Sequence, residues 1–454
     1  MKTIRIEKTD YLKGIIDAPP SKSYTIRAII AGSLSRGLKI VNPLFSEDTR
    51  AAMSSLRKLG AKIEKGRGYL KISGFGAKES IKRTAKIAKK VIAEGDFLAG
   101  KPSLRGGIIN TAESGTLLRL ILPLIALGKG SFTVTGRGTL LKRTNKPIAE
   151  ALLSLGVDIQ GKDEEYRLPI KIKADGSLPG GKVEVSGSIS SQTVSALLLS
   201  GGLAKEDMEI TVKDKLVSRP YVDITLDVLE RAGIKVKRRG YQRFFIPAGQ
   251  RFNFNNDFVV PGDYSSAAFL IAAACLVPSD VVIKGLFKDK QGDRGIIAIL
   301  NRMGAGIRHS NNEVRIKGPF ELKAADIDAG DTPDLAPLLT AVACLAKGRT
   351  RIYNIGHLAH KESNRLSTPA GELRKLGADI KIGRDSLIVR GAALRPAKVS
   401  SCDDHRIAMS LAVIGLRIGG VVIEGAGAAA KSYPGFVRDM RKLGAKIIAC
   451  RDRL

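Results

Sequence analysis

The sequence predicts a large α/β protein built from six similar units, and three observations support this prediction. One phrase, an amphipathic helical stretch that ends at Gly and leads into an alternating strand, occurs six times. The spacing of these glycines leaves room in each unit for another strand and a second helix. The 454 residues suffice for two to four domains, and a threefold arrangement in each of two lobes fits six units. The glycines are Gly60, Gly156, Gly233, Gly304, Gly377 and Gly444.

The first copy, residues 53–72, illustrates the helix, glycine and hairpin that we predict in each unit. Met53, Leu56 and Leu59 are spaced to form one buried helical face, and Gly60 stands where a helix closes through left-handed backbone. Residues 61–72 then alternate apolar and polar side chains around a Gly turn, which predicts a β-hairpin. The alternative is chance recurrence, because helix, Gly and strand form the commonest phrase of α/β proteins.

Composition argues for a folded chain in a reducing compartment. Hydrophobic residues make up 44% of the sequence, which suffices for a core, and no apolar run reaches the roughly 18 residues of a membrane span. Residues 1–10 lack the apolar run of a signal peptide. The four cysteines are far apart and have no zinc-type spacing. We therefore expect a cytoplasmic protein without a metal site.

The net charge of +31, from 75 Lys and Arg against 44 Asp and Glu, raises nucleic acid as a partner. The basic residues are spread along the chain, however. In the one locally dense stretch, Lys78–Lys101, the basic residues between Lys82 and Lys90 have no aromatic residues interleaved among them for base stacking. We expect this stretch to be solvated surface and the charge to suit small polyanions.

Several loop-to-helix junctions carry polar side chains that suit an anion. Pro19 and Pro20 force an extended entry, after which Lys22, Ser23 and Arg27 cluster at the first turns of a helix, where free N–H groups attract negative charge. A plain capped helix start is the alternative. Similar junctions are residues 110–119, 187–192, 216–221 and 401–409.

Two loop-to-helix junctions in the second half of the chain can each be interpreted in two ways. Asp334 precedes an apolar helix, which suits either a functional carboxylate or a simple N-cap. His357 and His360 would need further close ligands to hold a metal, so we interpret them as polar contacts to substrate. Five cationic residues at such junctions, if brought together, would bind a ligand with several negative charges: Lys22, Arg27, Lys361, Arg406 and Lys431.

Eight motifs, in order and spacing, resemble those of the 5-enolpyruvylshikimate-3-phosphate synthase (3-phosphoshikimate 1-carboxyvinyltransferase) family. They are Pro20–Arg27, Ser114–Arg119, Ser190–Gln192, Ser218–Tyr221, Pro333–Asp334, Lys361–Arg365, Asp404–Met409 and Lys431–Pro434. The resemblance implies the two-lobed enolpyruvyl transferase fold, an inside-out α/β barrel with six βαβαββ repeats, three per lobe. It implies one discontinuous lobe of residues 1–18 plus 258–454, a second lobe of residues 19–257, and an active site in the cleft between them.

The resemblance also implies two sets of binding residues. Shikimate 3-phosphate would be bound by Lys22, Ser23, Arg27, Ser190, Ser191, Gln192, Ser218, Tyr221, Asp334, His357 and Lys361. Phosphoenolpyruvate would be bound by Lys22, Gly115, Arg143, Gln192, Arg365, Arg406 and Lys431.

The implied reaction transfers the enolpyruvyl group of phosphoenolpyruvate to the 5-hydroxyl of shikimate 3-phosphate and releases phosphate, a step of the shikimate pathway to aromatic amino acids. Asp334 would be the base for the hydroxyl, and Glu362 would move the methylene proton. Lys22 and Lys431 would assist proton transfer and stabilise charge. The family implies no metal or organic cofactor, and a cytoplasmic monomer without nucleic-acid or membrane partners.

Two departures from the family pattern leave assignments open. The loop 136–147 is longer than expected, so Arg143 is preferred for phosphoenolpyruvate, with Lys142 and Arg137 as alternatives. His357 stands where some members have Asn.

Two rival functions remain. A UDP-N-acetylglucosamine enolpyruvyl transferase would usually carry a reactive Cys in the first half of the chain, and here the first Cys is Cys275. A nucleic-acid-binding relative is favoured only by net charge.

Overall fold

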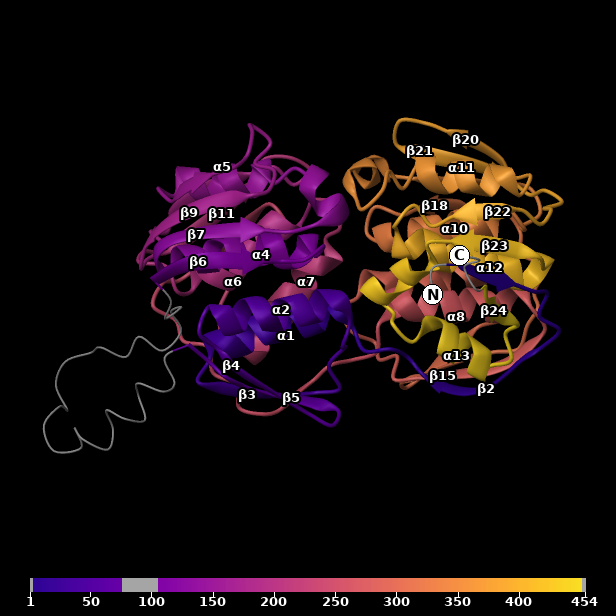
Figure 1. Cartoon of the computed structure of the whole chain (residues 1–454), viewed down its shortest axis with the longest axis horizontal. Helices are drawn as coiled ribbons and strands as arrows, with labels where there is room; N and C mark the ends of the chain where they lie inside the picture. The colour runs from indigo at the N-terminus through magenta and orange to yellow at the C-terminus, as the bar shows by residue number, and fades with distance from the viewer. Residues whose placement is uncertain (1–2, 76–104, 451–454) are drawn as a thin grey trace, which may run out of the picture. The chain divides into compact units, whose positions relative to one another are not determined.

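The computed structural model describes residues 3–75 and 105–450, so the basic stretch Lys78–Lys101 lies outside the described residues. The chain forms two compact units. The first, Lys22–Val260, is called the inserted unit; the second, Met1–Ser21 with Pro261–Leu454, is called the split unit. Both are drawn in Figure 1.

The inserted unit contains twelve of the described strands. Its strands are β3 (Gly37–Val41), β4 (Lys62–Gly66), β5 (Tyr69–Ser73), β6 (Arg105–Asn110), β7 (Lys129–Thr135), β8 (Asp158–Gln160), β9 (Ile170–Asp175), β10 (Gly181–Val185), β11 (Met208–Val212), β12 (Lys237–Arg239), β13 (Arg243–Ile246) and β14 (Phe258–Val259). Its helices are α1 (Lys22–Leu34), α2 (Glu47–Lys58), α4 (Gly115–Ala126), α5 (Lys146–Ser154), α6 (Gln192–Gly201), α7 (Pro220–Arg231) and the 3₁₀ helix η1 (Gly138–Lys142).

The split unit contains the other twelve. Its strands are β1 (Thr3–Ile6), β2 (Leu12–Asp17), β15 (Ser279–Lys284), β16 (Arg308–Ser310), β17 (Glu313–Ile316), β18 (Asp326–Asp328), β19 (Arg349–Tyr353), β20 (Asp379–Ile382), β21 (Ser386–Arg390), β22 (Lys398–Ser400), β23 (Val421–Glu424) and β24 (Ile447–Ala449). Its helices are α8 (Tyr264–Leu276), α9 (Gly295–Arg302), α10 (Ala336–Ala343), α11 (Ser367–Lys375), α12 (His405–Ile418), α13 (Phe436–Lys442) and the 3₁₀ helices η2 (Gly292–Arg294), η3 (Pro333–Leu335), η4 (Gly356–His360) and η5 (Ala426–Lys431).

All six described sheets have four strands and one plan: a parallel pair, then two further strands that are each antiparallel to their neighbour. The inserted unit has the strand orders β14-β3-β5-β4, β6-β7-β9-β8 and β10-β11-β13-β12. The split unit has β2-β15-β17-β16, β18-β19-β21-β20 and β22-β23-β1-β24. The predicted fold class, α/β with six βαβαββ repeats arranged three and three, is confirmed.

The chain passes from one unit to the other twice, each time shortly after a strand that pairs within the unit it is leaving. β2 precedes α1 in sequence but pairs with β15 of the split unit, whereas β14 precedes α8 but pairs with β3 of the inserted unit. Beside the crossing points, the Ser21 amide donates to the carbonyl of Pro261 at 2.8 Å. The N-terminal strand β1 completes the last sheet between β23 and β24.

The six predicted helix ends share one hydrogen-bond pattern. After α2, Gly60 has φ +105°, its amide donates to Arg57 O at 3.0 Å, and the Ala61 amide donates to Leu56 O at 3.0 Å. This pair of bonds satisfies carbonyls at the helix end and requires left-handed backbone, which favours Gly. The same bonds and a positive φ occur at Gly156, Gly233, Gly304, Gly377 and Gly444.

The helices lie inside and the sheets outside. Along β9 buried and exposed residues alternate strictly, so one face of the sheet meets the core and the other meets solvent. Three helices of each unit are buried along almost their whole length: α1, α4 and α6, and α8, α10 and α12. Their N-terminal ends carry the chemistry described next.

Candidate active site

Residues predicted for the site gather at the N-terminal ends of buried helices in both units. Lys22 begins α1, Gly115 begins α4 and Gln192 begins α6. Asp334 lies in η3, which directly precedes α10, and Arg406 lies in the first turn of α12. Unsatisfied backbone N–H groups give such helix ends a partial positive charge. The placement suits anionic ligands.

Arg27 is the most deeply buried cationic side chain among the described residues of the inserted unit. Only 1% of it is exposed, and its guanidinium donates to Thr225 Oγ1 at 2.7 Å and to the carbonyls of Ser23 and Tyr221 at 3.2 Å. Burial lowers its pKa to about 10. Among the residues that the structure describes, no carboxylate forms an ion pair with Arg27.

Lys22 is paired with a residue that sequence reasoning did not select. Its Nζ lies 3.0 Å from Asp48 Oδ2, and both side chains are largely buried. Asp48 lies in the first turn of α2, which Ser46 and Thr49 cap reciprocally. The capping pattern at residues 46–49 was the available sequence signal for this helix start.

Three residues predicted to bind phosphoenolpyruvate, Gln192, Gly115 and Arg143, lie close to one another in the inserted unit. Gln192 accepts a hydrogen bond from Arg119 Nη1 at 2.6 Å and donates one to Thr116 Oγ1 at 3.1 Å. The Arg143 guanidinium lies so close to Gly115 that a Cβ there would be 2.6 Å from its Nη1. Arg119 and Thr116 were not predicted as site residues, although both lie in a selected motif.

The alternatives to Arg143 lie elsewhere. The Arg137 side chain is 64% exposed and reaches Glu47 at 3.6 Å and Glu113 at 3.9 Å. Lys142 is exposed at the end of η1. Of the three basic residues, Arg143 is therefore the one placed against Gly115.

The loops that carry Ser190 and Ser218 are tied together at their base. Asp214 accepts hydrogen bonds from the Gly187 amide and from Ser186 Oγ, the latter at 2.8 Å, and the Val217 amide donates to Gly187 O at 3.0 Å. Ser190 Oγ accepts from the Gln192 amide at 3.2 Å. The adjacent Ser191 precedes α6 without capping it through its side chain.

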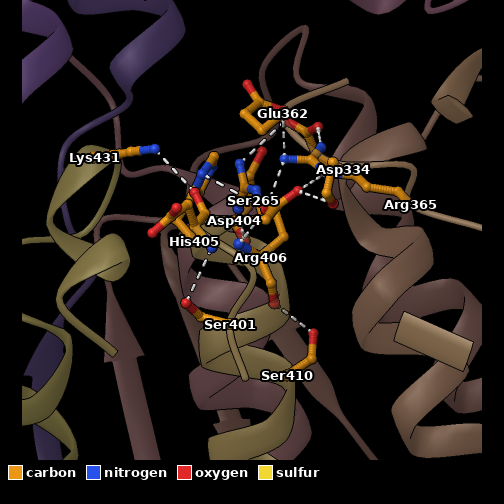
Figure 2. A network of polar contacts seen from close by, with 12 residues as sticks. Ser265, Asp334, Glu362, Arg365, Ser401, Asp404, His405, Arg406, Ser410 and Lys431 are labelled. Carbon is orange, nitrogen blue, oxygen red and sulfur yellow. Dashed lines mark hydrogen bonds and ion pairs between the residues drawn. The ribbon is translucent and has the colours of Figure 1, made fainter. Parts of the chain in front are cut away.

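The split unit places two carboxylates and two arginines in one network (Figure 2). Asp334 accepts from Arg365 Nη1 at 2.7 Å and from Arg406 Nη2 at 3.1 Å. Asp404 accepts from Arg365 Nε at 2.8 Å and from the Arg406 amide at 2.9 Å, so it also caps α12. The N-cap of α10 is Leu335, without a side-chain cap hydrogen bond, so the simple N-cap interpretation of Asp334 is not met.

Arg365 connects three carboxylates. Besides Asp334 and Asp404, Glu362 Oε2 lies 2.9 Å from its Nη2. Burial opposes the charge of this guanidinium, but Asp404, Glu362 and Asp334 together raise its pKa well above the usual value. Burial likewise opposes ionisation of Asp404, and Arg365 nevertheless lowers the pKa of that carboxyl. The network is therefore ionic.

The remaining predicted residues of this unit border the network. Lys431 Nζ donates to the carbonyl of Asp403 at 2.9 Å, and its side chain is seen in Figure 2 pointing toward this loop. His357 lies in η4, where burial and then Lys361 lower its pKa to about 3, so it is neutral at physiological pH. Lys361 directly follows η4.

Within residues 3–75 and 105–450, no group of three or more His, Cys, Asp or Glu could hold a metal ion. None of the helices in the same ranges is long and apolar enough to cross a membrane.

Comparison with known proteins gives concordant matches. The family model described as EPSP synthase (3-phosphoshikimate 1-carboxyvinyltransferase) matches residues 6–440. The 3-phosphoshikimate 1-carboxyvinyltransferase of Methanosarcina mazei is 39% identical over 441 residues, 96% of each chain. That of Methanocella arvoryzae is 41% identical over 446 residues, 98% of this chain and 99% of the relative. An EPSP synthase structure from Acinetobacter baumannii has a TM-score of 0.79 at 26% identity, over 99% of this chain and 100% of that chain.

Proposed function

Since the chain belongs to the EPSP synthase (3-phosphoshikimate 1-carboxyvinyltransferase) family, we propose how its residues divide the work of that reaction. The protein is a transferase of the shikimate pathway. It transfers the enolpyruvyl group of phosphoenolpyruvate to the 5-hydroxyl of shikimate 3-phosphate, and phosphate leaves.

Shikimate 3-phosphate is bound by the junctions of the inserted unit, in this proposal, and the burial of Arg27 is the observation that carries it. A buried guanidinium whose recorded hydrogen bonds go to neutral oxygens is costly. An anionic group of the substrate beside it would supply the countercharge. Ser23 and Tyr221, whose carbonyls hold Arg27, belong to the same proposed set as Lys22, Ser190, Ser191, Gln192 and Ser218. The split unit adds Asp334, His357 and Lys361.

Phosphoenolpyruvate is bound by guanidinium groups from both units. Arg143, placed against Gly115 and beside the motif that holds Gln192, is the contribution of the inserted unit together with Lys22. Arg365, Arg406 and Lys431 are the contribution of the split unit. The planar fork of Arg matches carboxylate and phosphate oxygens in pairs.

The carboxylates of the split unit then move the protons. Anionic substrate groups that bind Arg365 and Arg406 compete with Asp334 for these donors, which leaves its carboxylate able to accept the proton of the 5-hydroxyl. The hydroxyl oxygen bonds to C2 of phosphoenolpyruvate while Glu362, which takes up a proton once a substrate anion replaces it at Arg365, delivers that proton to C3.

In the second step Glu362 takes a proton back from C3 and the bond between C2 and the phosphate oxygen breaks. Phosphate leaves with the proton that Asp334 took from the 5-hydroxyl. Lys22 and Lys431 stabilise the developing charge.

The organisation around this chemistry is also proposed. The lobe bounds implied by the resemblance, 1–18 plus 258–454 and 19–257, differ by a few residues from the two compact units, because β14 pairs with β3 of the inserted unit. We propose that both lobes contribute to one active site. We expect a cytoplasmic monomer that acts on small molecules and does not use nucleic acid as a partner. The four free cysteines, Cys275, Cys344, Cys402 and Cys450, suit a reducing compartment.

Phosphate release tests the assignment. With shikimate 3-phosphate and phosphoenolpyruvate as substrates, Arg27→Ala, Asp334→Ala and Glu362→Ala should each reduce turnover at least about a hundredfold. Arg36→Ala, which removes an exposed arginine two residues after α1, is the matched control and should remain close to wild type. Near-normal turnover in all three site variants would overturn the proposed roles.

A further inference from the structure

Asp293 is a buried carboxyl group that none of the roles above uses. It lies in η2 and is only 3% exposed. Its Oδ2 accepts a hydrogen bond from Ser265 Oγ. Its Oδ1 is buried and has no hydrogen-bond partner among the described residues. A carboxylate placed in this way would be costly if charged, because only one of its oxygens is satisfied.

Ser265 connects this carboxyl group to the network of Figure 2. The hydroxyl of Ser265 reaches Asp293, while its carbonyl oxygen accepts from Arg406 Nη1 at 2.8 Å. The other terminal nitrogen of Arg406 donates to Asp334 at 3.1 Å. The guanidinium of Arg406 is thus held between Ser265 on α8 and Asp334 on η3.

The charged groups that face Asp293 come from three elements. Asp334 before α10 and Asp263 at the N-cap of α8 disfavour a negative charge on it, whereas Arg406 on α12 favours one. Burial is the largest effect, and together with Asp334 it raises the pKa of Asp293 to about 7. The residue therefore keeps its proton well above the usual range of a carboxyl group.

We propose that Asp293 is a positioning residue for phosphoenolpyruvate binding, which as an uncharged acid fixes Ser265 and so holds the Arg406 guanidinium without placing a second negative charge beside it. The uncharged form matters because an ionised Asp293 would neutralise part of the charge that the substrate anion needs. The proposal rests on the proposed role of Arg406, and the experiment separates the two.

The experiment measures KM and kcat for each substrate from pH 6 to 9, together with the melting temperature. Asp293→Ala should raise the KM for phosphoenolpyruvate about tenfold and leave the KM for shikimate 3-phosphate within about twofold, the effect of losing one supporting hydrogen bond. Ser265→Ala removes only the hydroxyl and should act in the same direction. It keeps the test decisive where Asp293→Ala fails to fold.

Asp293→Asn is the variant that tests the uncharged form. Its amide is neutral at every pH, so its KM for phosphoenolpyruvate should match wild type at pH 6. Above pH 7 the KM of the wild type should rise further than that of Asp293→Asn. Asp439→Asn alters another buried carboxyl group of the split unit, which lies in α13, and should show wild-type pH dependence.

Each remaining outcome decides between the two proposals. If Arg406→Ala leaves the KM for phosphoenolpyruvate unchanged, the role of Arg406 fails and that of Asp293 fails with it. If Arg406→Ala raises this KM while folded Asp293→Ala and Ser265→Ala do not, only the role of Asp293 is overturned. Equal increases in KM for both substrates with a lower melting temperature would show a purely structural residue and would also overturn it.

Discussion

Asp404 holds Arg365 in a two-pronged ion pair in which both side chains are almost completely buried. Arg365 Nε lies 2.8 Å from Oδ2 and its Nη2 lies 3.1 Å from Oδ1. The same carboxylate accepts from the amide of Arg406 at 2.9 Å and from Ser363 Oγ at 3.0 Å. One carboxylate thus binds both of the split-unit arginines that we propose for phosphoenolpyruvate, the guanidinium of Arg365 and the backbone amide of Arg406.

Asp404→Ala should lower the free energy of unfolding by about 3 to 5 kcal/mol, because it removes the fully buried, two-pronged countercharge of the Arg365 guanidinium and the cap of α12. Urea unfolding measures this. Asp403→Asn changes the adjacent exposed carboxyl group at φ +57°, a backbone conformation that Asn tolerates, and should cost less than about 0.5 kcal/mol. Similar losses in the two variants would contradict the structural role of the Asp404 carboxylate.

Asp293 should make stability depend on pH in the direction opposite to Asp404. Its pKa is about 7 in the folded protein and about 4 in an unfolded chain. A raised folded-state pKa contributes stability that is fully present below about pH 4 and is lost as the pH rises to about 7. Asp293→Asn removes this dependence.

The difference in unfolding free energy, Asp293→Asn minus wild type, should therefore grow between pH 5 and 7 and then level off. Urea titrations at fixed ionic strength give this difference. A value that stays constant over the range would show that Asp293 is ionised in the folded protein.

Gly115→Ala should weaken phosphoenolpyruvate binding selectively. The new methyl group would meet Arg143 at 2.6 Å from Nη1 and 3.0 Å from Cζ, so the guanidinium must shift. We expect the KM for phosphoenolpyruvate to rise about tenfold, with little change for shikimate 3-phosphate. Gly371→Ala in α11, where nothing lies within 4 Å of the added methyl group, is the control for Gly replacement. An unchanged KM in Gly115→Ala would argue against Arg143 as a ligand.

Two alanine variants distinguish Arg143 from Arg137 as the residue of loop 136–147 that binds phosphoenolpyruvate. Arg143→Ala should raise the KM for phosphoenolpyruvate at least about tenfold, the loss expected for a charged hydrogen bond to a substrate anion. Arg137→Ala should change it less than about twofold, because that side chain is mostly exposed and pairs with surface carboxylates. The reverse order of effects would transfer the role to Arg137.

The sequence predicted local features well because they depend on neighbouring residues. Each of the six glycines ends a helix in left-handed backbone, as the pattern around Gly60 indicated. The hairpin after Gly60 forms β4 and β5 as expected. The order of units and their division into three and three followed from repeating the same local pattern.

Features that depend on distant contacts could not be predicted in this way. Asp293 follows no apolar helical pattern, and its partner Ser265 is fixed to an arginine 141 positions away in the sequence. Asp48 lies in the first turn of a capped helix, where the local pattern explains an acidic residue, yet it pairs with Lys22. In both cases the tertiary fold, and not the local pattern, determines burial and therefore charge. The roles of the proposed binding residues stay predictions until the assays above are made.

The insertion of one unit between Ser21 and Pro261 has a consequence for biosynthesis. All residues of the inserted unit emerge from the ribosome before most of its host has been translated, so it can fold first. The two earliest strands remain unpaired in the meantime, since among the described strands β2 pairs only with β15 and β1 only with β23 and β24. A chaperone that shields nascent β1 and β2 would thus protect two open sheet edges for most of the time of synthesis.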